Sequence, residues 1–465
     1  MWDRIVLAWR PGHQSPPHCP TNMTSPSRPH LIRAVGLFSL TSIAVNGTVG
    51  SGIFVLPAQV AKFLGPAGLA AYVIAALAMC LIVLCFAEVA TLFDRSGGPY
   101  LYARAAFGGL VGFEIGWMLL LARLTSIAAI SNAFAAYLGF FWPAAATGVG
   151  RVIVITAALA ILTVINFRGV KQGTWVNNVL TVSKLATLAV FIVAGMFLLE
   201  PNRPPAWSLP PPGALQQASF LLIFAFGGFE FAVVPGEEIE RPKRNLPIAL
   251  LSAIAIVTVF YVLIQFVAQS TLPDLATSAT PLASAAHRFL GPLGGVLLTA
   301  GAVLSTTGTN SALMLVTPRI LFAMAEGRQL PQIFAGVHPR YRTPYVSIVA
   351  AAVLGWASAM YSGFAALAAI SAIARLLYYI ATCVALLVLR RKMPDVERGF
   401  RVPGGPTIPL AAVALSIWLL MGSTKTQISI SAATLVAGAI VYWSYQRSLA
   451  AAERRLAHAA KNTAG

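Results

Sequence analysis

The amino-acid sequence predicts an all-α membrane protein with twelve transmembrane helices. Apolar residues make up 58% of the 465 residues and charged residues only 10%, whereas soluble domains carry about 25% charged residues. Apolar runs of about 18 residues or more, long enough for a helix to cross the hydrocarbon layer of a bilayer, recur along the chain. Because these runs are continuously apolar and do not alternate as barrel strands do, they indicate helices.

Twelve apolar runs define the expected spans, and we expect the helix ends within a few residues of their limits. The spans are 36–62, 69–92, 108–140, 150–167, 175–199, 216–236, 248–271, 292–325, 345–362, 364–389, 407–422 and 428–445. Residues 1–33 are rich in Pro, His and Arg and lack the apolar core of a signal peptide, which predicts a disordered cytoplasmic tail. Met1 and Met23 are alternative starts of the chain.

The net charge of +18 is distributed as a membrane topology requires. When alternate loops are assigned to opposite sides, twenty-four of the 32 Lys and Arg residues fall on the side that holds both termini. The opposite side keeps Arg151, Arg203, Arg288 and Lys425. The positive-inside rule then places both termini in the cytoplasm and predicts a multi-pass protein of the cell (inner) membrane, embedded in the lipid bilayer. No soluble basic module for nucleic acid is predicted.

Two of the predicted spans are interrupted. The first span contains GTVGSGIF at 47–54 and the sixth contains AFGGFE at 225–230, and each Gly costs a helix about 1 kcal/mol relative to Ala. Spans one and six are equivalent if the first ten helices form two repeats of five, and paired interruptions are typical of a transporter binding site. The alternative is that these glycines only let helices pack closely. The matched positions favour the binding site.

An unwound segment exposes backbone amides at the start of one half-helix and carbonyls at the end of the other. A zwitterion satisfies both kinds of group, which predicts an amino-acid substrate. Its carboxylate is expected on the amides of Gly50, Ser51 and Gly52. Its ammonium is expected on carbonyls near Thr48, Phe224, Ala225 and Gly227.

Three motifs carry a resemblance to a known family. They are GSGIF at 50–54, GGPYLYAR at 97–104 with Phe107-Gly108, and GEE at 236–238 with PKRNLP at 242–247. In this order they resemble the amino acid-polyamine-organocation (APC) family over residues 34–445. The resemblance implies a LeuT-type fold, alternating access, and a site lined by helices 1, 3, 6, 8 and 10.

The resemblance also implies a division of the chain. The transport core is expected over 34–389, as two inverted repeats at about 36–199 and 216–389. Peripheral helices 11 and 12 are expected within 390–446, followed by a cytoplasmic tail at 447–465.

By similarity to the arginine/agmatine antiporter of this family, Phe224 matches an aromatic residue that closes over substrate. Tyr379 matches a gating tyrosine of helix 10. The alternative for both residues is ordinary packing among the apolar helices.

Lys184 lies deep in the fifth span, where proton-dependent members of the family have a lysine. The resemblance implies that its ammonium stands in for the sodium ion of sodium-coupled relatives. Burial disfavours the charged form of a lysine, so Lys184 is a candidate proton carrier. The alternative is a permanently charged strut that releases no proton.

Arg123, Glu230 and Arg375 are the other charges deep within spans. By similarity, Glu230 matches an acidic residue with a role in pH response or gating, and the two arginines match uncharged substrate-lining positions. In one account Glu230 and an arginine only neutralise each other. In the other, a spare guanidinium faces the site and reads an anionic side chain. Two arginines repel a cationic substrate, so neutral or acidic amino acids are expected.

Three acidic residues near the cytoplasmic ends of spans two and three, Glu88, Asp94 and Glu114, are expected to pair with loop arginines. The run from Glu237 and Glu238 to Lys243 and Arg244 is either an inner gate or a solvated charge cluster.

The leading functional prediction is a proton-coupled amino-acid transporter. An exchanger of the same fold and a receptor that binds without transport are the alternatives. No enzyme motif, cofactor motif or metal-ligand spacing occurs in the sequence, and the six histidines fall outside the apolar spans. The four cysteines are expected to be packing residues. The exact substrate, the direction of transport, and the choice between monomer and homodimer stay open.

Overall fold

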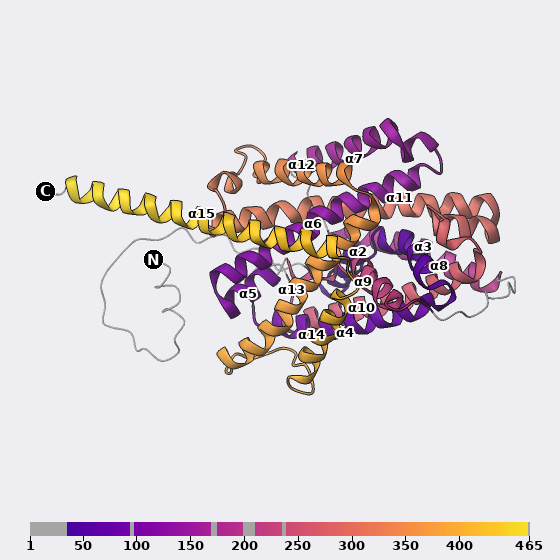
Figure 1. The fold of residues 1–465 in the computed structure, drawn as a ribbon, viewed down its shortest axis with the longest axis horizontal. Coiled ribbons are helices and arrows are strands. Elements are labelled where there is room, and N and C mark those ends of the chain that lie inside the picture. Colours follow the sequence, from indigo (N-terminus) through magenta and orange to yellow (C-terminus); the bar gives the residue numbers. More distant parts are fainter. Residues whose placement is uncertain (1–34, 94–96, 169–173, 199–209, 235–238, 464–465) are drawn as a thin grey trace. The chain divides into compact units, whose positions relative to one another are not determined.

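A computed structural model describes residues 35–93, 97–168, 174–198, 210–234 and 239–463, and this part of the chain consists of helices joined by turns and loops (Figure 1). An isolated parallel bridge joins Val35 to Ile239, and these described ranges contain no β-strand. The predicted tail at 1–33 lies outside the described residues, as do Asp94 and the Glu237/Glu238 pair.

The principal helical elements of the first half of the fold run from Leu37 to Thr271. They are α2 (Leu37–Thr48), α3 (Gly52–Leu64), α4 (Gly68–Ala90), α5 (Pro99–Phe107), α6 (Gly109–Leu138), α7 (Gly148–Arg168), α8 (Thr174–Phe197), α9 (Ala214–Phe226), the 3-10 helix η3 (Phe229–Val233) and α10 (Pro242–Thr271). The second half continues with α11 (Pro281–Glu326), α12 (Tyr345–Tyr361), α13 (Phe364–Lys392), α14 (Thr407–Leu420) and α15 (Lys425–Thr463).

Helix occurs in each of the predicted spans, with informative differences at the boundaries. The short helix α5 lies between the second and third predicted spans and is too short to cross a membrane. It starts at Pro99, and proline is favoured at the first helical position because it has no N–H to leave unpaired. Within α11 the chain bends at Gly291, where φ is +69°, so a helical segment precedes the predicted eighth span. The last helix, α15, continues past the predicted limit of 445 to Thr463.

The apolar helices give the chain the character of an all-α membrane protein. Nine segments of the described chain are long and apolar enough to cross a membrane, and α12 and α14 are shorter apolar helices. Large apolar side chains on α7 point outward, with Ile153 56% and Ile161 60% exposed. Such exposure would be unfavourable over a large area in water but suits a lipid-facing helix.

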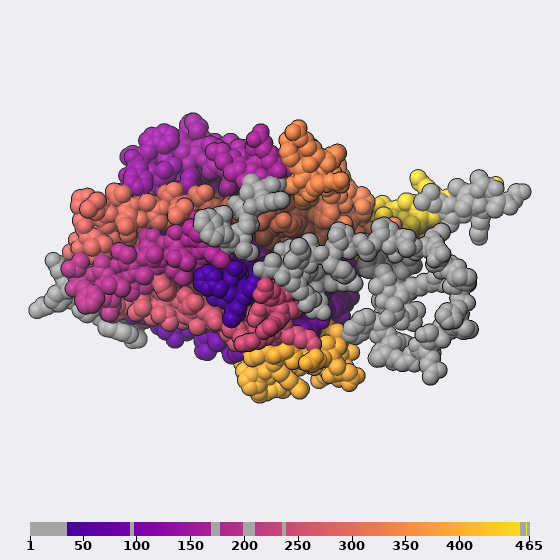
Figure 2. All heavy atoms as spheres, turned by 180° about the vertical axis from the view of Figure 1, so that it is seen from behind, coloured from indigo at the N-terminus to yellow at the C-terminus, as the bar shows by residue number. Residues whose placement is uncertain are grey.

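The interrupted first segment lies in the interior of the helix assembly. Its first half, α2, packs against α8, α10 and η3, and its second half, α3, packs against α9 and α11. In Figure 2, indigo atoms of this segment are visible between magenta atoms of α8 and pink atoms of α10. Helix α6 packs against α11, α12 and α13.

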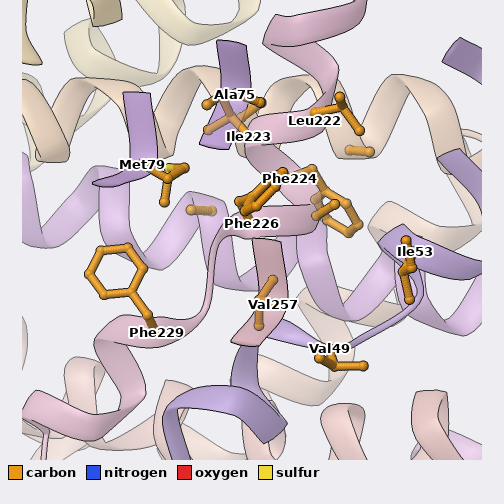
Figure 3. Packing of buried hydrophobic residues seen from close by; sticks show 14 of the residues in the cluster. Val49, Ile53, Ala75, Met79, Leu222, Ile223, Phe224, Phe226, Phe229 and Val257 are labelled. Carbon is orange, nitrogen blue, oxygen red and sulfur yellow. The ribbon is translucent and has the colours of Figure 1, made fainter. Parts of the chain in front are cut away.

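The two interrupted segments share one apolar cluster. Figure 3 shows Val49 and Ile53 of the first segment together with Ile223, Phe226 and Phe229 of the second. All five side chains are almost completely buried. Burial of such side chains contributes roughly 1.5–3 kcal/mol each, so this packing fixes the two breaks relative to each other.

Candidate functional site

Both predicted breaks are present, and they touch. Helix α2 ends at Thr48 and α3 begins at Gly52, while α9 ends at Phe226 and η3 begins at Phe229. A Cβ atom added to Gly52 would lie 2.6 Å from Ala225 Cα, and one added to Gly47 would lie 2.6 Å from Gly228 O. Any side chain at these glycines would therefore push the two segments apart.

A small cavity lies between the breaks. It is lined by Gly47, Thr48, Gly50, Ser51, Gly52, Ser126, Ile130, Phe224, Gly227, Phe231, Thr309, Leu313 and Arg375. These residues come from the first, third, sixth, eighth and tenth predicted spans, which are the five that the family resemblance implies. The cavity volume is about 20 Å³, which is room for about one water molecule. In this structure the cavity is therefore too small to hold an amino acid.

Most of the residues predicted to bind substrate line this cavity. Seven of the nine do so: Thr48, Gly50, Ser51, Gly52, Phe224, Gly227 and Arg375. Ala225 lies directly behind the lining, in contact with Gly52. Arg123 is next to Phe231 and does not belong to the lining.

The first break presents polar groups to the cavity. The Ser51 hydroxyl oxygen is buried and has no hydrogen-bond partner among the described residues. Ser51 is also the residue that precedes α3, where the first amide groups of a helix have no carbonyl partner within that helix. The Gly50 amide differs from this expectation, because it donates to Thr48 O at 2.9 Å. The amides of Ser51 and Gly52 are thus the better placed anion-binding groups.

Tyr261 of α10 joins the two breaks, and the sequence analysis missed it. Its hydroxyl lies 3.1 Å from Thr48 O and 3.1 Å from Ala225 O. One hydroxyl proton serves one of these carbonyls at a time. A tyrosine in the middle of an apolar span was the available signal, since a buried tyrosine hydroxyl usually finds a partner.

Glu230 is the centre of a buried polar network. Arg375 donates to Glu230 Oε1 at 2.8 Å and Tyr378 donates to the same oxygen at 2.8 Å. Tyr379 and the Gly228 amide donate to Oε2 at 3.2 and 2.9 Å. Tyr379, predicted as a gating residue, therefore positions Glu230 and lies outside the cavity lining.

The two arginines differ in their relation to the cavity. Arg375 lines it and also donates to Ser126 and Ser371. Arg123 Nη2 lies 3.9 Å from Glu230 Oε1, and its guanidinium lies over the Phe231 ring at 3.9 Å from the centroid. The ion pairs of the first account are thus present. Arg375 faces the cavity but is paired with Glu230 at 2.8 Å, and the less tightly paired Arg123 does not line the cavity, so the second account stays a prediction.

Lys184 of α8 lies beside the first break, with neutral partners. Its ammonium donates to Val49 O at 3.0 Å and to Thr309 Oγ1 at 2.8 Å, and Asn46 O lies at 3.4 Å. The Ser305 hydroxyl donates to the same Val49 carbonyl at 3.1 Å. Within the described ranges no carboxylate forms an ion pair with Lys184. The sequence analysis missed Ser305 and Thr309, although polar residues four apart in an apolar span were visible.

Phe224 has the surroundings that either of its predicted roles requires. It lines the cavity, is 5% exposed, and packs edge-on against Phe364 with ring centroids 5.6 Å apart. An aromatic ring at this position narrows the cavity from the side of α9.

Comparison with known proteins decides the family. Residues 35–444 match the family described as amino acid permease. The chain belongs to this family, and thus to the APC superfamily of permeases. The permease is 31% identical over 440 residues to the methylthioribose transporter of Bacillus subtilis (strain 168), covering 90% of this chain and 94% of that protein.

Two further relatives come from the same organism. The permease is 28% identical over 445 residues to the branched-chain amino acid permease BcaP, covering 90% of this chain and 94% of that protein. It is 30% identical over 410 residues to the serine/threonine exchanger SteT, covering 85% of this chain and 91% of that protein. These relatives are membrane transporters.

The acidic residues outside the site divide into two cases. Glu88 at the end of α4 is fully buried and binds Arg390 and Arg398, with Arg390 donating to Oε1 at 2.8 Å. The expected pairing with loop arginines is correct for Glu88. It is wrong for Glu114, because neither oxygen of that carboxyl group has a hydrogen-bond partner among the described residues. Position near a helix end did not reveal that Glu114 faces another helix, α15.

Proposed function

We propose that this permease is a secondary transporter that moves neutral or acidic amino acids across the cell inner membrane by alternating access, with proton coupling. The observation that carries the proposal is the cavity at two touching helix breaks, lined by Arg375 and by the Ser51 hydroxyl, which has no hydrogen-bond partner among the described residues. Family membership supports amino-acid transport as the general activity.

The proposed topology has twelve crossings with both termini in the cytoplasm. The first ten crossings form two inverted repeats, with α2/α3 and α9/η3 at equivalent positions. The matching places of the two breaks support this arrangement. The charge distribution supports the orientation.

The proposed binding mode places a zwitterion across the two breaks. Its carboxylate accepts from the amides of Ser51 and Gly52 and from the Ser51 hydroxyl at the start of α3. Its ammonium approaches the carbonyl of Ala225, which has a second lone pair beside the one facing Tyr261, and the carbonyl of Thr48, which also accepts from the Gly50 amide. Both ends of the substrate then contact a segment that is able to move.

The small cavity supports a conformational cycle. Room for about one water molecule is too little for an amino acid, so substrate entry requires separation of the breaks. The close contact between Gly52 and Ala225 would have to separate in such a movement. Alternating access then consists of opening this site to one side of the membrane at a time.

Charge supports the substrate class. Two buried arginines share the single carboxylate of Glu230, so one positive charge remains beside the cavity. A cationic side chain would be repelled there, whereas a neutral or acidic side chain would be accepted. Two of the relatives are named for branched-chain amino acids and for serine and threonine, which carry no charged side chain.

The contacts of Lys184 support proton coupling. Neutral oxygens hold the ammonium without the large penalty that separation from a buried carboxylate would add. Loss of the proton weakens the contact between the first break and Thr309 of α11. Protonation and the position of the break are thereby linked.

Transport by purified protein in proteoliposomes tests the proposal. The panel is the twenty amino acids, several amines, and methylthioribose, with and without an inward proton gradient. We expect the gradient to drive accumulation of neutral or acidic amino acids. Arginine and lysine should not be transported. A requirement for substrate on the opposite side would indicate an exchanger, and binding without counterflow would indicate a receptor. Accumulation of methylthioribose alone would overturn the amino-acid assignment.

Two glycine variants show whether the cavity is the site. Gly52→Ala places a Cβ atom 2.6 Å from Ala225 Cα, whereas the same change at Gly363 meets no atom within 4 Å. We expect Gly52→Ala to reduce substrate affinity at least about tenfold, or about 1.4 kcal/mol. Gly363→Ala should bind as the wild type does. Equal affinities in both variants would place the binding site elsewhere.

A further inference from the structure

Glu114 is a half-buried residue whose carboxyl group the proposed transport site does not use. It lies in α6, one and a half turns from the start of the helix, on the face that packs against α15. Both oxygens of its carboxyl group are buried, and neither has a hydrogen-bond partner among the described residues. By contrast, the buried carboxyl groups of Glu88 and Glu230 each have several donors.

The carboxyl group of Glu114 occupies space that is free because residue 438 of α15 is a glycine. A Cβ atom on Gly438 would lie 2.9 and 3.1 Å from the two oxygens of Glu114, and 2.7 Å from Trp117 Cδ1. The Trp117 indole donates to Thr434 O at 2.9 Å, one turn earlier in α15. The carboxyl group is therefore covered by the backbone of α15, and the hydrogen bond from Trp117 joins the two helices beside it.

The charged and titratable groups of the neighbouring elements have other positions or partners. On α5, Arg104 lies beside Gly112, on a different face of α6, and donates to the Tyr100 hydroxyl at 3.1 Å. Tyr100 in turn donates to Gln329 at 2.7 Å. The hydroxyl of Tyr442 on α15 lies at Gly109, more than one turn from Glu114. None of these groups forms an ion pair with Glu114 in the described part of the chain.

A carboxylate without donors or a cation is strongly disfavoured in an apolar environment, and the neutral acid is disfavoured much less. We propose that Glu114 is a proton-binding site, occupied by a proton while α15 packs against α6. The proton converts the carboxylate to a carboxylic acid without other chemistry. This site is separate from Lys184 and does not depend on the transport function proposed above.

The bound proton stabilises the contact between two functionally different helices. Helix α6 carries Ser126 and Ile130 of the cavity lining, whereas α15 is a peripheral helix at the end of the chain. Release of the proton would leave a carboxylate that needs water or a cation, which the closed interface does not provide. Deprotonation therefore favours separation of α15 from α6.

Infrared spectroscopy of the full-length protein in lipid nanodiscs tests the proposal directly. A neutral carboxyl group has a carbonyl absorption that a carboxylate lacks. At neutral pH we expect this absorption in the wild type and its loss in Glu114→Gln. The matched control is Glu397→Gln, because Glu397 is 85% exposed and paired with Lys243 at 2.8 Å. That control should retain the signal. An absorption unchanged by Glu114→Gln would overturn the proposal.

Thermal unfolding gives a second readout that does not depend on transport. The folded wild type holds a proton that the unfolded chain releases near neutral pH, so its stability should fall as the pH rises from about 5 to about 8. Glutamine keeps the shape of the neutral acid and does not ionise. The melting temperature of Glu114→Gln should exceed that of the wild type increasingly as the pH rises over this interval. A difference that stays constant with pH would contradict the proposal.

Discussion

Lys184 and Arg375 are buried cations at the edge of the same site, yet their partners are of different kinds. Lys184 donates to neutral oxygens of Val49 and Thr309. Arg375 donates to the carboxylate of Glu230, which also accepts from two tyrosines. A guanidinium with a carboxylate partner stays charged, whereas an ammonium among neutral dipoles is able to lose its proton. The comparison separates a fixed charge from a candidate proton carrier.

The fixed charge predicts the largest effect. Glu230→Ala leaves two buried guanidinium groups without a carboxylate, and breaking a buried pair in this way costs about 3–5 kcal/mol. We expect the free energy of unfolding, measured by chemical denaturation in detergent, to fall by this amount.

Glu397 provides the control for Glu230. Its carboxyl group is exposed, and the hydrogen bond from Lys243 lowers its pKa from the usual range. Exposed ion pairs contribute little to stability, so Glu397→Ala should unfold as the wild type does. If Glu230→Ala lost as little stability as Glu397→Ala, the Glu230 carboxylate would not be needed to stabilise the buried charge of Arg375.

The candidate proton carrier predicts a loss of coupling. Lys184→Met keeps a long side chain but removes the titratable amine. We expect accumulation driven by a proton gradient to fall at least about tenfold, which is about 1.4 kcal/mol, while uptake becomes independent of pH. Lys425→Met, at an exposed lysine that begins α15, serves as the control. If proton-driven accumulation persists in Lys184→Met, Lys184 is not the proton carrier and has only a structural role.

Thr309, a hydrogen-bond partner of Lys184, gives a second test of the role of Lys184. Thr309→Val removes the hydroxyl that accepts from Lys184 at 2.8 Å, a loss of about 1 kcal/mol. The Lys184 ammonium then has one accepting oxygen fewer, so its charged form is less stable. The pH at which uptake is half maximal should therefore fall. Thr307→Val, at an exposed position of α11, should leave this pH unchanged. A shift of equal size in both variants would contradict the assignment.

The sequence predicted the breaks well because their cause is local. Glycine and serine weaken a helix wherever they occur, so the interruptions at 47–54 and 225–230 could be located from the residues themselves. Arg123, Lys184, Glu230 and Arg375 were equally visible, since charges are rare in apolar spans.

The partners of these residues could not be predicted in the same way, because they come from distant parts of the chain. Thr309 lies 125 positions from Lys184, and Tyr261 lies 213 positions from Thr48. Glu114 shows the same difficulty. Loop arginines were the expected partners of Glu114. The packing of the helices decides which neighbour its side chain meets, and that neighbour is Gly438 of α15.

Tyr261, which contacts both breaks, predicts the smallest effect. Its hydroxyl shares one proton between Thr48 O and Ala225 O, the carbonyls proposed to receive the substrate ammonium. Tyr261→Phe removes this donor, so in an empty site Ala225 O would lose it while Thr48 O would keep the Gly50 amide, and a bound ammonium would satisfy Ala225 O. We therefore expect substrate affinity to increase about threefold, or by less than about 1 kcal/mol, while the stability of the empty protein falls. Tyr361→Phe, at a tyrosine that is 90% exposed, is the matched control in the same binding titration. Weaker binding in Tyr261→Phe alone would mean that the hydroxyl itself contacts the substrate, and the ammonium would then have to lie elsewhere.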